Sequence, residues 1–289
     1  MATYNGKVAL ITGANAGIGK VTALELAKKG MRIIMACRNL ETAKTAQESI
    51  IKESCNENVE VKRLDLGSLA SVNEFADEIV SSVEKIDYLI NNAGVMSLPF
   101  TLTVDGFESH IGINHFGHFL LTLRLLDLVK KADCARIVNV SSMAGKAGKL
   151  RFDDIHFSKG SYWSYSAYAQ SKLANMLFTV ELARRLAETN VTAYAVHPGV
   201  VDTPLYRNQW SISKVVMWPI KKLFMKTPEQ GAETTLYCVL EEGIEKLSGK
   251  YFADSKLSSV PAKCENKDHA LRLWNLSMKT VGLSEGGEE

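Results

Sequence analysis

Short apolar runs alternate along the chain with longer stretches in which apolar residues recur at helical spacing. Six runs have the length of buried strands: Val8–Ile11, Arg32–Ala36, Val59–Leu64, Asp87–Ile90, Arg136–Val140 and Val191–Val196. Strands that alternate with helices leave room for the long crossovers that a parallel pair of strands needs. The pattern therefore predicts an α/β fold with a single doubly wound parallel sheet and helices on both faces.

The pattern also bears on domain organisation. No stretch rich in proline, glycine or serine interrupts the alternation, so residues 1–283 are predicted to form one domain, followed by a solvated tail at 284–289. Most of the six prolines lie beyond residue 197, where the alternation becomes irregular. We expect this irregular region to carry the elements that select a substrate.

Composition and charge narrow the class of protein. Hydrophobic residues make up 46% of the chain and charged residues 23%, which is ordinary for a globular protein and excludes a disordered or fibrous one. Thirty-four lysines and arginines against 32 aspartates and glutamates leave a net charge of +2. This charge is too nearly balanced for a protein that binds DNA or RNA.

Cysteines and apolar segments bear on the cell compartment. The five cysteines are widely spaced and include no CxxC pair, so we expect neither a disulfide framework nor a thiolate zinc site. A reducing compartment fits best. No segment approaches the roughly 18 uncharged apolar residues that a transmembrane helix needs. The sequence therefore predicts a cytoplasmic protein.

A glycine-rich turn, Gly13-Ala14-Asn15-Ala16-Gly17-Ile18-Gly19, follows the first predicted strand. After it, Lys20–Lys29 is predicted to be a helix closed by Gly30. Glycines let the backbone approach a pyrophosphate closely, and the positive end of the helix dipole attracts its charge. The strand, turn and helix together favour a Rossmann-type nucleotide site over a tight turn without a ligand.

The second predicted strand ends in Ala36-Cys37-Arg38-Asn39. In nucleotide-binding sheets of this kind, an acidic residue at this point holds the ribose 2′-hydroxyl and repels a 2′-phosphate. An arginine can instead grip phosphate oxygens with two hydrogen bonds. The position therefore favours NADP over NAD, the alternative being that Arg38 is a solvated residue at a helix end.

Tyr168 and Lys172 lie four residues apart in a stretch with a helical pattern, Ser166–Asn175, so their side chains share one face. An ammonium beside a phenol favours the phenolate and makes the tyrosine a usable proton donor or acceptor. A chain with this many tyrosines and lysines is expected to contain about one such pair by chance. The pair needs further motifs before it indicates a function.

Six weak motifs occur in the order typical of one family. They are the glycine turn, Asn91-Asn92-Ala93-Gly94, Asn114, Ser141-Ser142, Tyr168 with Lys172, and Pro198-Gly199. In this combination the sequence resembles the short-chain dehydrogenases/reductases over nearly its whole length. The resemblance implies hydride transfer between a nicotinamide cofactor and a carbonyl or alcohol.

The resemblance also implies a role for each catalytic residue. Tyr168 would be the general acid/base, and Lys172 would tune it and bind the nicotinamide ribose. Ser142, the second serine of its pair, would orient the substrate carbonyl, because strand alternation turns Ser141 to the other face. Asn114 would complete a water-mediated proton relay to Lys172.

Cofactor contacts are implied in the same way. Asp65 and Leu66 would border the adenine, and the segment beginning at Pro198 would hold the nicotinamide carboxamide. The full set expected to contact NADP or NADPH is Gly13, Asn15, Ala16, Gly17, Ile18, Gly19, Arg38, Asn39, Asp65, Leu66, Asn92, Ala93, Gly94, Tyr168, Lys172, Pro198, Gly199, Val200 and Thr203.

Four segments look like the retinol dehydrogenase branch of this family: Ala36–Asn39, Ser171–Asn175, Val196–Gly199 and Lys226–Gly231. That branch mostly reduces retinal and other lipophilic aldehydes with NADPH, so a small lipophilic carbonyl or alcohol is the expected substrate. A steroid or xenobiotic carbonyl reductase is the alternative among enzymes. A cofactor-binding scaffold without catalysis is the alternative of another class. Relatives often dimerise through their long helices, which makes a homodimer a further expectation.

Residues 203–227 are expected to form a lid over the substrate. Apolar and aromatic residues alternate there with lysines, and Tyr206, Trp210, Trp218 and Phe224, with Ser142, are the expected substrate contacts. Residues 214–226 could alternatively lie on an intracellular membrane as a peripheral contact. An ordinary helix that covers the core is the third interpretation. The long interval between Ser142 and Tyr168 further indicates an inserted loop beside the pocket.

Three histidines raise the question of a metal site. His115 and His118 lie three residues apart on a predicted helix, and His110 precedes them. We find no cysteine or carboxylate in the sequence that completes the set. Because zinc needs three or four ligands with oriented surroundings, we expect no metal site here.

Overall fold

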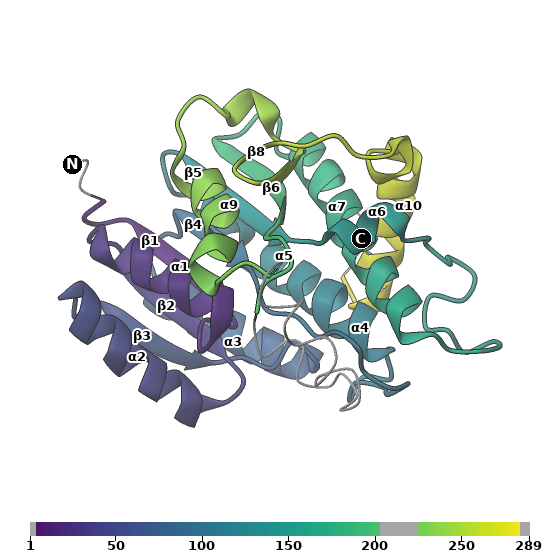
Figure 1. Ribbon diagram of the computed structural model, residues 1–289, viewed down its shortest axis with the longest axis horizontal. Coiled ribbons are helices and arrows are strands. Elements are labelled where there is room, and N and C mark those ends of the chain that lie inside the picture. The colour runs from purple at the N-terminus through teal and green to yellow at the C-terminus, as the bar shows by residue number, and fades with distance from the viewer. Residues whose placement is uncertain (1–3, 203–224, 284–289) are drawn as a thin grey trace, which may run out of the picture.

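The computed structural model describes residues 4–202 and 225–283. One sheet runs through the centre of the molecule in the order β3-β2-β1-β4-β5-β6-β7-β8 (Figure 1). All neighbouring strands are parallel except β7 and β8. The strands are β1 (Val8–Thr12), β2 (Arg32–Cys37), β3 (Val59–Arg63), β4 (Tyr88–Asn91), β5 (Ala135–Val140), β6 (Val191–His197), β7 (Tyr251–Ala253) and β8 (Lys256–Leu257).

The six strands expected from the apolar runs are all present. They form a parallel sheet because each returns to the same edge after a helical crossover. The chain builds outward from β1 to β3, returns to β4 beside β1, and then builds in the other direction. This reversal between β1 and β4 opens a crevice at the carboxyl ends of the strands, where open sheets of this class bind their ligands.

Helices cover both faces of this sheet, as the alternation predicts. One layer contains α1 (Gly17–Lys28), α2 (Leu40–Ser54) and α9 (Pro228–Leu240). The other contains α3 (Leu69–Ser82), α5 (Gly117–Lys130) and α7 (Ser164–Arg185), with α10 (Lys267–Thr280) packed on α7. Between longer elements lie α4 (Ser109–Ile111), the π-helix η1 (Gly112–Phe116), α6 (Met143–Ala147), and the short turns η3 (Glu245–Leu247) and η4 (Ala262–Cys264).

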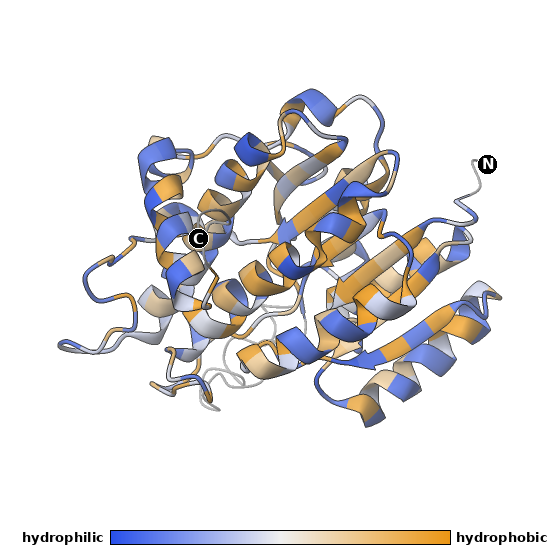
Figure 2. Ribbon diagram, turned by 180° about the vertical axis from the view of Figure 1, so that it is seen from behind, coloured by the Kyte–Doolittle hydropathy of each residue, from blue (hydrophilic) through white to orange (hydrophobic). Residues whose placement is uncertain are grey.

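The core is divided into two layers by strand alternation. Leu10 packs into the core beneath α3, α5 and α7, whereas its neighbour Ile11 packs into the core beneath α1 and α2. Every residue of β1 is buried, as expected for a parallel strand covered on both faces. Figure 2 shows apolar residues concentrated along the strands and hydrophilic residues on the outward helix faces.

Some boundaries differ from the expected ones. Helix α1 begins at Gly17 rather than Lys20, because the end of the glycine turn already forms its first helical turn. It ends at Lys28, one residue before the expected end, and Gly30 follows the capping Lys29 in the expected left-handed conformation (φ +88°). Strands β7 and β8 were not predicted, since neither contains an apolar run of ordinary strand length.

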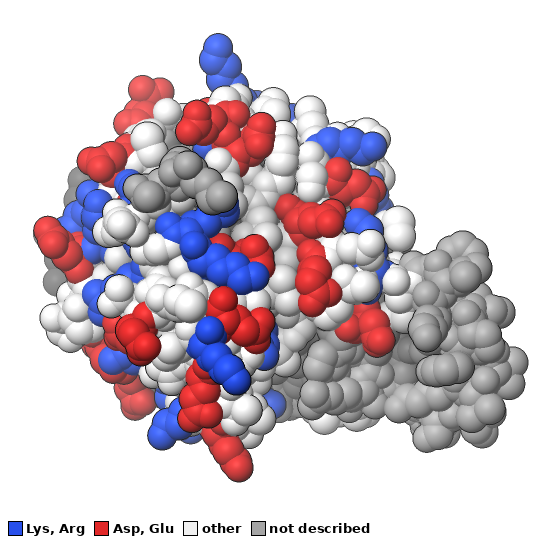
Figure 3. Space-filling model, turned by 60° about the vertical axis from the view of Figure 1, so that its left-hand side comes forward, with Lys and Arg blue, Asp and Glu red and all other residues white. Residues whose placement is uncertain are grey.

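The expected lid and the expected tail extend beyond the described residues. Residues 203–224 of the expected lid and the tail at 284–289 lie outside the described residues. Within 4–202 and 225–283, no helix is both long enough and apolar enough to cross a membrane. On the face drawn in Figure 3, lysine and arginine side chains are interspersed with aspartate and glutamate side chains.

Candidate active site

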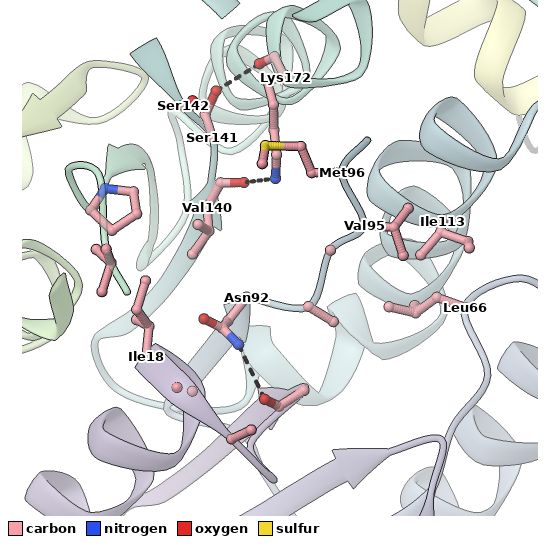
Figure 4. A pocket seen from close by; sticks show the side chains of 18 of the residues that line it. Ile18, Leu66, Asn92, Val95, Met96, Ile113, Val140, Ser141, Ser142 and Lys172 are labelled. Atoms are coloured by element: carbon pink, nitrogen blue, oxygen red, sulfur yellow. Dashed lines mark hydrogen bonds between the residues drawn. The ribbon is translucent and has the colours of Figure 1, made fainter. Parts of the chain in front are cut away.

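A cavity of about 900 Å³ opens at the carboxyl ends of the strands, at the reversal between β1 and β4. Its walls come from the glycine turn, the ends of β2, β4, β5 and β6, and the first turns of α7. Figure 4 shows Asn92, Ser142 and Lys172 around this space, with Leu66, Val95 and Ile113 together on one side. The expected cofactor and catalytic positions therefore share one cavity.

The glycine turn is closely packed against the residues after β4. A Cβ atom on Gly19 would lie 2.5 Å from Asn92 Nδ2 and 2.5 Å from the Gly13 carbonyl oxygen. Asn92 Nδ2 also donates to the Thr12 carbonyl oxygen at 2.7 Å. A side chain at position 19 would push these backbones apart, so glycine is required there by contact rather than by conformation.

The first turn of α1 fits a pyrophosphate. Ala16, at the cap position, supplies no side-chain hydrogen bond to the open N–H groups, and this turn contains no acidic residue. The open N–H groups and the positive end of the helix dipole thus face the cavity without a carboxylate to neutralise them. These features are the requirements for binding an anion at a helix N-terminus.

Arg38 and Asn39 take different positions at the end of β2. Asn39 caps α2, because its Oδ1 accepts the Thr42 N–H at 2.9 Å. Arg38 is exposed and lines the cavity, and within the described residues no carboxylate oxygen lies within 4.0 Å of its guanidinium nitrogens. Asn39 therefore makes the helix-end contact considered for Arg38, whose charge stays available to a ligand phosphate.

Tyr168 and Lys172 project into the cavity from successive turns of α7. Lys172 Nζ lies 5.8 Å from the centre of the Tyr168 ring and donates to the Val140 carbonyl oxygen at 3.0 Å. Burial lowers the pKa of Lys172 to about 8, because the ammonium loses hydration in this cavity wall. The amine can therefore gain or lose a proton close to neutral pH.

The two serines after β5 have different surroundings. Ser141 is buried and its hydroxyl donates to the Lys172 carbonyl oxygen at 2.7 Å. Ser142 caps α6, accepting the Ala144 N–H at 3.2 Å, and is partly exposed in the cavity. Ser142 thus faces the cavity, whereas the hydroxyl hydrogen of Ser141 is already donated to the Lys172 carbonyl oxygen (Figure 4).

Asn114 lies in the π-helix η1, behind the cavity wall. Its side-chain amide bonds both backbone groups of Val95: Oδ1 accepts the Val95 N–H at 2.8 Å, and Nδ2 donates to the Val95 carbonyl oxygen at 3.0 Å. Nδ2 also donates to Ser171 Oγ at 2.9 Å. A Cβ on Gly94 would lie 3.2 Å from Asn114 Oδ1 and 3.5 Å from Lys172 Nζ. Gly94 therefore lets these two side chains approach one corner of the site.

The structure brings together nearly all the predicted site residues that it describes. Every expected cofactor residue from Gly13 to Val200 lines the cavity, as does Ser142, and Asn114 supports the wall from behind. The expected contacts Thr203, Tyr206, Trp210, Trp218 and Phe224 lie outside the described residues. The segments before and after residues 203–224 are hydrogen-bonded to each other beside the cavity, because the Lys226 N–H donates to the Val200 carbonyl oxygen at 2.8 Å.

Sequence reasoning missed several lining residues. Met96, Met143, Tyr165 and His197 all border the cavity. Tyr165 could have been found, because a residue three positions before Tyr168 on a helix shares its face. The loop expected beside the pocket contains four aromatic residues that are not among the residues lining the cavity: Phe152, Phe157, Tyr162 and Trp163.

The three histidines each have a protein partner. His115 Nε2 lies 2.8 Å from Ser277 Oγ, and His118 Nε2 lies 2.8 Å from Thr12 Oγ1. His110 Nδ1 lies 2.7 Å from Glu108 Oε1. Glu108 is buried beside His110, but this one carboxylate does not complete a set of metal ligands with the histidines. Within the described ranges, histidine, cysteine and acidic residues form no group of three that could hold a metal ion.

Comparison with known proteins agrees with this geometry. The family model described as short chain dehydrogenase matches residues 7–213. The chain belongs to the short-chain dehydrogenase/reductase family, whose members are oxidoreductases that bind a nicotinamide cofactor. A crystal structure of an uncharacterized protein from Mycobacterium paratuberculosis has a TM-score of 0.81 and 35% identity, covering 99% of this chain and 97% of that one.

Within this family the chain is similar to retinol dehydrogenases. It is 49% identical over 278 residues to retinol dehydrogenase 12 of Mus musculus, covering 96% of this chain and 87% of that protein. It is 46% identical over 282 residues to retinol dehydrogenase 11 of Homo sapiens, covering 96% and 86%. The protein is thus a retinol dehydrogenase-like oxidoreductase.

Proposed function

We propose that the protein reduces a lipophilic aldehyde of the retinal type and uses NADPH as its cofactor. The observation that carries this proposal is the arrangement of the cavity, in which the glycine turn and Arg38 lie at one end and Ser142, Tyr168 and Lys172 at the other. The phosphates of a cofactor and the reacting carbonyl of a substrate could therefore bind in the same cavity. The sequence similarity to retinol dehydrogenases supports the choice of substrate class.

Arg38 supports NADPH over NADH. The Arg38 guanidinium is exposed in the cavity and pairs with no carboxylate of the described chain, so it could bind a 2′-phosphate. The amides at the start of α1 would bind the pyrophosphate, and Lys172 would bind the nicotinamide ribose. NADPH bound in this way supplies a hydride to the substrate.

The reacting carbonyl would lie between Ser142 and Tyr168. The Ser142 hydroxyl would donate to the carbonyl oxygen and hold it as negative charge develops there. Tyr168 would then give its phenolic proton to that oxygen. The Lys172 ammonium, 5.8 Å from the centre of the Tyr168 ring, would assist this proton transfer, and Asn114 would join Lys172 to solvent through a water.

Apolar and aromatic residues line the cavity beside the catalytic residues. Met96 and Met143 line the cavity with Tyr165, and the exposed fraction of Met143 is 54%. Flexible thioethers adapt to ligands of irregular shape. Such a wall suits an extended hydrocarbon better than a polar sugar or acid.

The decisive experiment is a carbonyl panel. Oxidation of NADPH is followed with retinal, a short aldehyde, a steroid ketone and a xenobiotic ketone, and the series is repeated with NADH. We expect the highest kcat/KM with retinal and NADPH. A higher kcat/KM for the steroid or xenobiotic ketone would favour the alternative reductase. Tight NADPH binding without turnover of any member would favour a scaffold protein.

A further inference from the structure

A buried histidine joins the cofactor end of the cavity to the catalytic end. His118 lies at the start of α5, four residues after Asn114, and only 2% of it is exposed. Its Nε2 lies 2.8 Å from Thr12 Oγ1, and its Nδ1 lies 3.1 Å from the Asn114 carbonyl oxygen. The proposed reaction uses no proton of this ring, so its two hydrogen bonds indicate a different role.

The surroundings of Thr12 determine which ring nitrogen carries the hydrogen. A threonine hydroxyl has one hydrogen to donate and two lone pairs. The Thr12 hydroxyl accepts the Asn92 N–H and the Ala93 N–H, each at 2.9 Å. With both lone pairs used, its hydrogen points to Nε2 of His118. A neutral imidazole holds one hydrogen, so these partners assign it to Nδ1, which donates to the Asn114 carbonyl oxygen.

Burial keeps this ring neutral. Loss of hydration lowers the pKa of His118 to about 3, although its hydrogen bond to the Asn114 carbonyl acts in the opposite direction. The positive charge of Lys172 lowers the pKa of His118 further. The neutral ring with its hydrogen on Nδ1 is therefore the form present at neutral pH.

The hydrogen bond from His118 Nδ1 fixes the direction of the Asn114 backbone carbonyl. The Asn114 side chain is already engaged by Val95 and Ser171, so its oxygen and nitrogen are fixed in the wall. A water in the proposed relay would have to use the backbone carbonyl. The direction of that carbonyl depends on the π-helix, in which the Gly117 N–H bonds back to the Gly112 carbonyl.

We propose that His118 is a positioning residue, which holds the Asn114 carbonyl for the proton relay through Nδ1–H and is itself held in this tautomer by the Thr12 hydroxyl. This inference rests on the proposed function, in which Asn114 and Lys172 serve proton transfer. Thr12 also fixes the turn at Asn92 and Ala93, which lines the cofactor cavity. One imidazole thus connects cofactor binding and proton transfer.

Two substitutions separate the two hydrogen bonds. His118→Asn puts an amide nitrogen where Nδ1 lies, so it keeps the donor to Asn114 and removes the acceptor for Thr12. His118→Gln puts an amide oxygen near Nε2, so it keeps the acceptor and removes the donor. His115→Gln is the matched control, because His115 is equally buried but is bonded to Ser277, away from the cavity.

We expect opposite effects from the two variants. His118→Gln should lower kcat for an aldehyde about tenfold and leave the Kd of NADPH within about twofold, since one hydrogen bond is worth about a factor of ten. His118→Asn should raise the Kd of NADPH about tenfold and leave kcat at saturating NADPH within about twofold. Quenching of tryptophan fluorescence measures the Kd without turnover.

Three results would overturn the proposal. Proportional losses of kcat and NADPH affinity in both variants would show that His118 only fills space. Values like those of His115→Gln in both variants would show that neither hydrogen bond matters. Nitrogen NMR of the unmodified protein gives an answer even if a variant does not fold, because a hydrogen on Nε2 of His118 would contradict the assigned tautomer.

Failure of the proposed function would look different. The unmodified protein would then bind NADPH but reduce no aldehyde in the panel. The NMR spectrum and the NADPH affinities of the two variants would still decide whether Thr12 fixes the tautomer of His118.

Discussion

The two ends of the cavity are built in different ways. At the cofactor end, Gly13, Gly19 and Asn92 contact one another through backbone atoms and one amide. Behind the substrate end, where the His110 ring packs edge-on against the Tyr168 ring, side chains that do not line the cavity join loops that are distant in sequence. Tyr162 donates to Glu108 Oε1 at 2.9 Å across 54 positions, and the Leu98 N–H donates to His110 Nε2 at 3.4 Å.

This difference affects what each end can tolerate. A turn held by backbone contacts needs small residues at the points of contact. Residues at its other positions can vary without disturbing it. The loops behind the substrate end depend on one carboxylate, because Glu108 is fully buried and accepts the N–H groups of His110 and Ile111 as well as the Tyr162 hydroxyl. Losing such a group leaves several donors without a partner.

The largest expected effect separates the two ends completely. Tyr168→Phe removes the proposed proton donor and leaves the glycine turn and Arg38 unchanged, so kcat should fall by about 10² to 10⁴. The Kd of NADPH, measured by fluorescence, should stay nearly constant. A variant that kept most of its kcat would refute the role of Tyr168. A parallel loss of NADPH affinity would show that the two ends are not independent.

The cofactor end is tested by Arg38→Asp. The substitution replaces a charge-assisted contact with repulsion, so the ratio of NADPH to NADH affinity should fall by about tenfold to a hundredfold. Lys44→Asp on α2 makes the same charge change at an exposed position outside the cavity and should leave the ratio unchanged. Equal use of NADPH and NADH by the unmodified protein would contradict the assignment.

The fold and the cofactor end could be largely predicted because their signals are local. Strands β1 to β6 contain apolar runs long enough to be recognised, and the turn from Gly13 to Gly19 is one continuous segment. β7 and β8 have three and two residues, and their pairing is decided by the neighbouring strand rather than by their own pattern.

The substrate end could not be predicted in the same way. Glu108 reads as an ordinary polar residue, and it becomes a buried anion only because the loop with Tyr162 folds over it. The Glu108 carboxylate then has an environment that depends on contacts between segments far apart in the sequence. Tyr165, by contrast, could be inferred from helical spacing once Tyr168 was recognised.

Glu108→Gln tests the substrate end. Burial raises the pKa of Glu108, but the hydrogen bonds that the carboxylate accepts from His110 and Ile111 outweigh it and hold that pKa below its usual value. The ionised form therefore stabilises the fold above the usual carboxyl pKa, and this stability is lost as pH falls through the lower folded pKa. At pH 7 the variant should lose about 2 kcal/mol of unfolding free energy in urea.

The loss should shrink when unfolding is measured below about pH 4, since Glu108 of the unmodified protein is then protonated to an increasing extent. Glu60→Gln is the control, because the ion pair of Glu60 with Arg32 is partly exposed and should contribute less than about 1 kcal/mol. A loss that did not depend on pH would show that Glu108 acts through its shape and not through its charge.

The smallest expected effect concerns a single aromatic ring at the substrate end. Tyr165 lines the cavity one turn before Tyr168 and is 49% exposed, so a long substrate can cover its open surface. Covering roughly 50 Å² at about 25 cal/mol per Å² is worth about 1 kcal/mol. Tyr165→Ala should therefore raise KM for retinal about fivefold and leave kcat and KM for a short aldehyde unchanged.

Trp163→Ala is the control. It removes a neighbouring exposed aromatic side chain that is not among the lining residues, and it should leave KM unchanged for both retinal and the short aldehyde. If Tyr165→Ala raised KM for long and short aldehydes equally, the Tyr165 ring would support Tyr168 rather than contact the substrate.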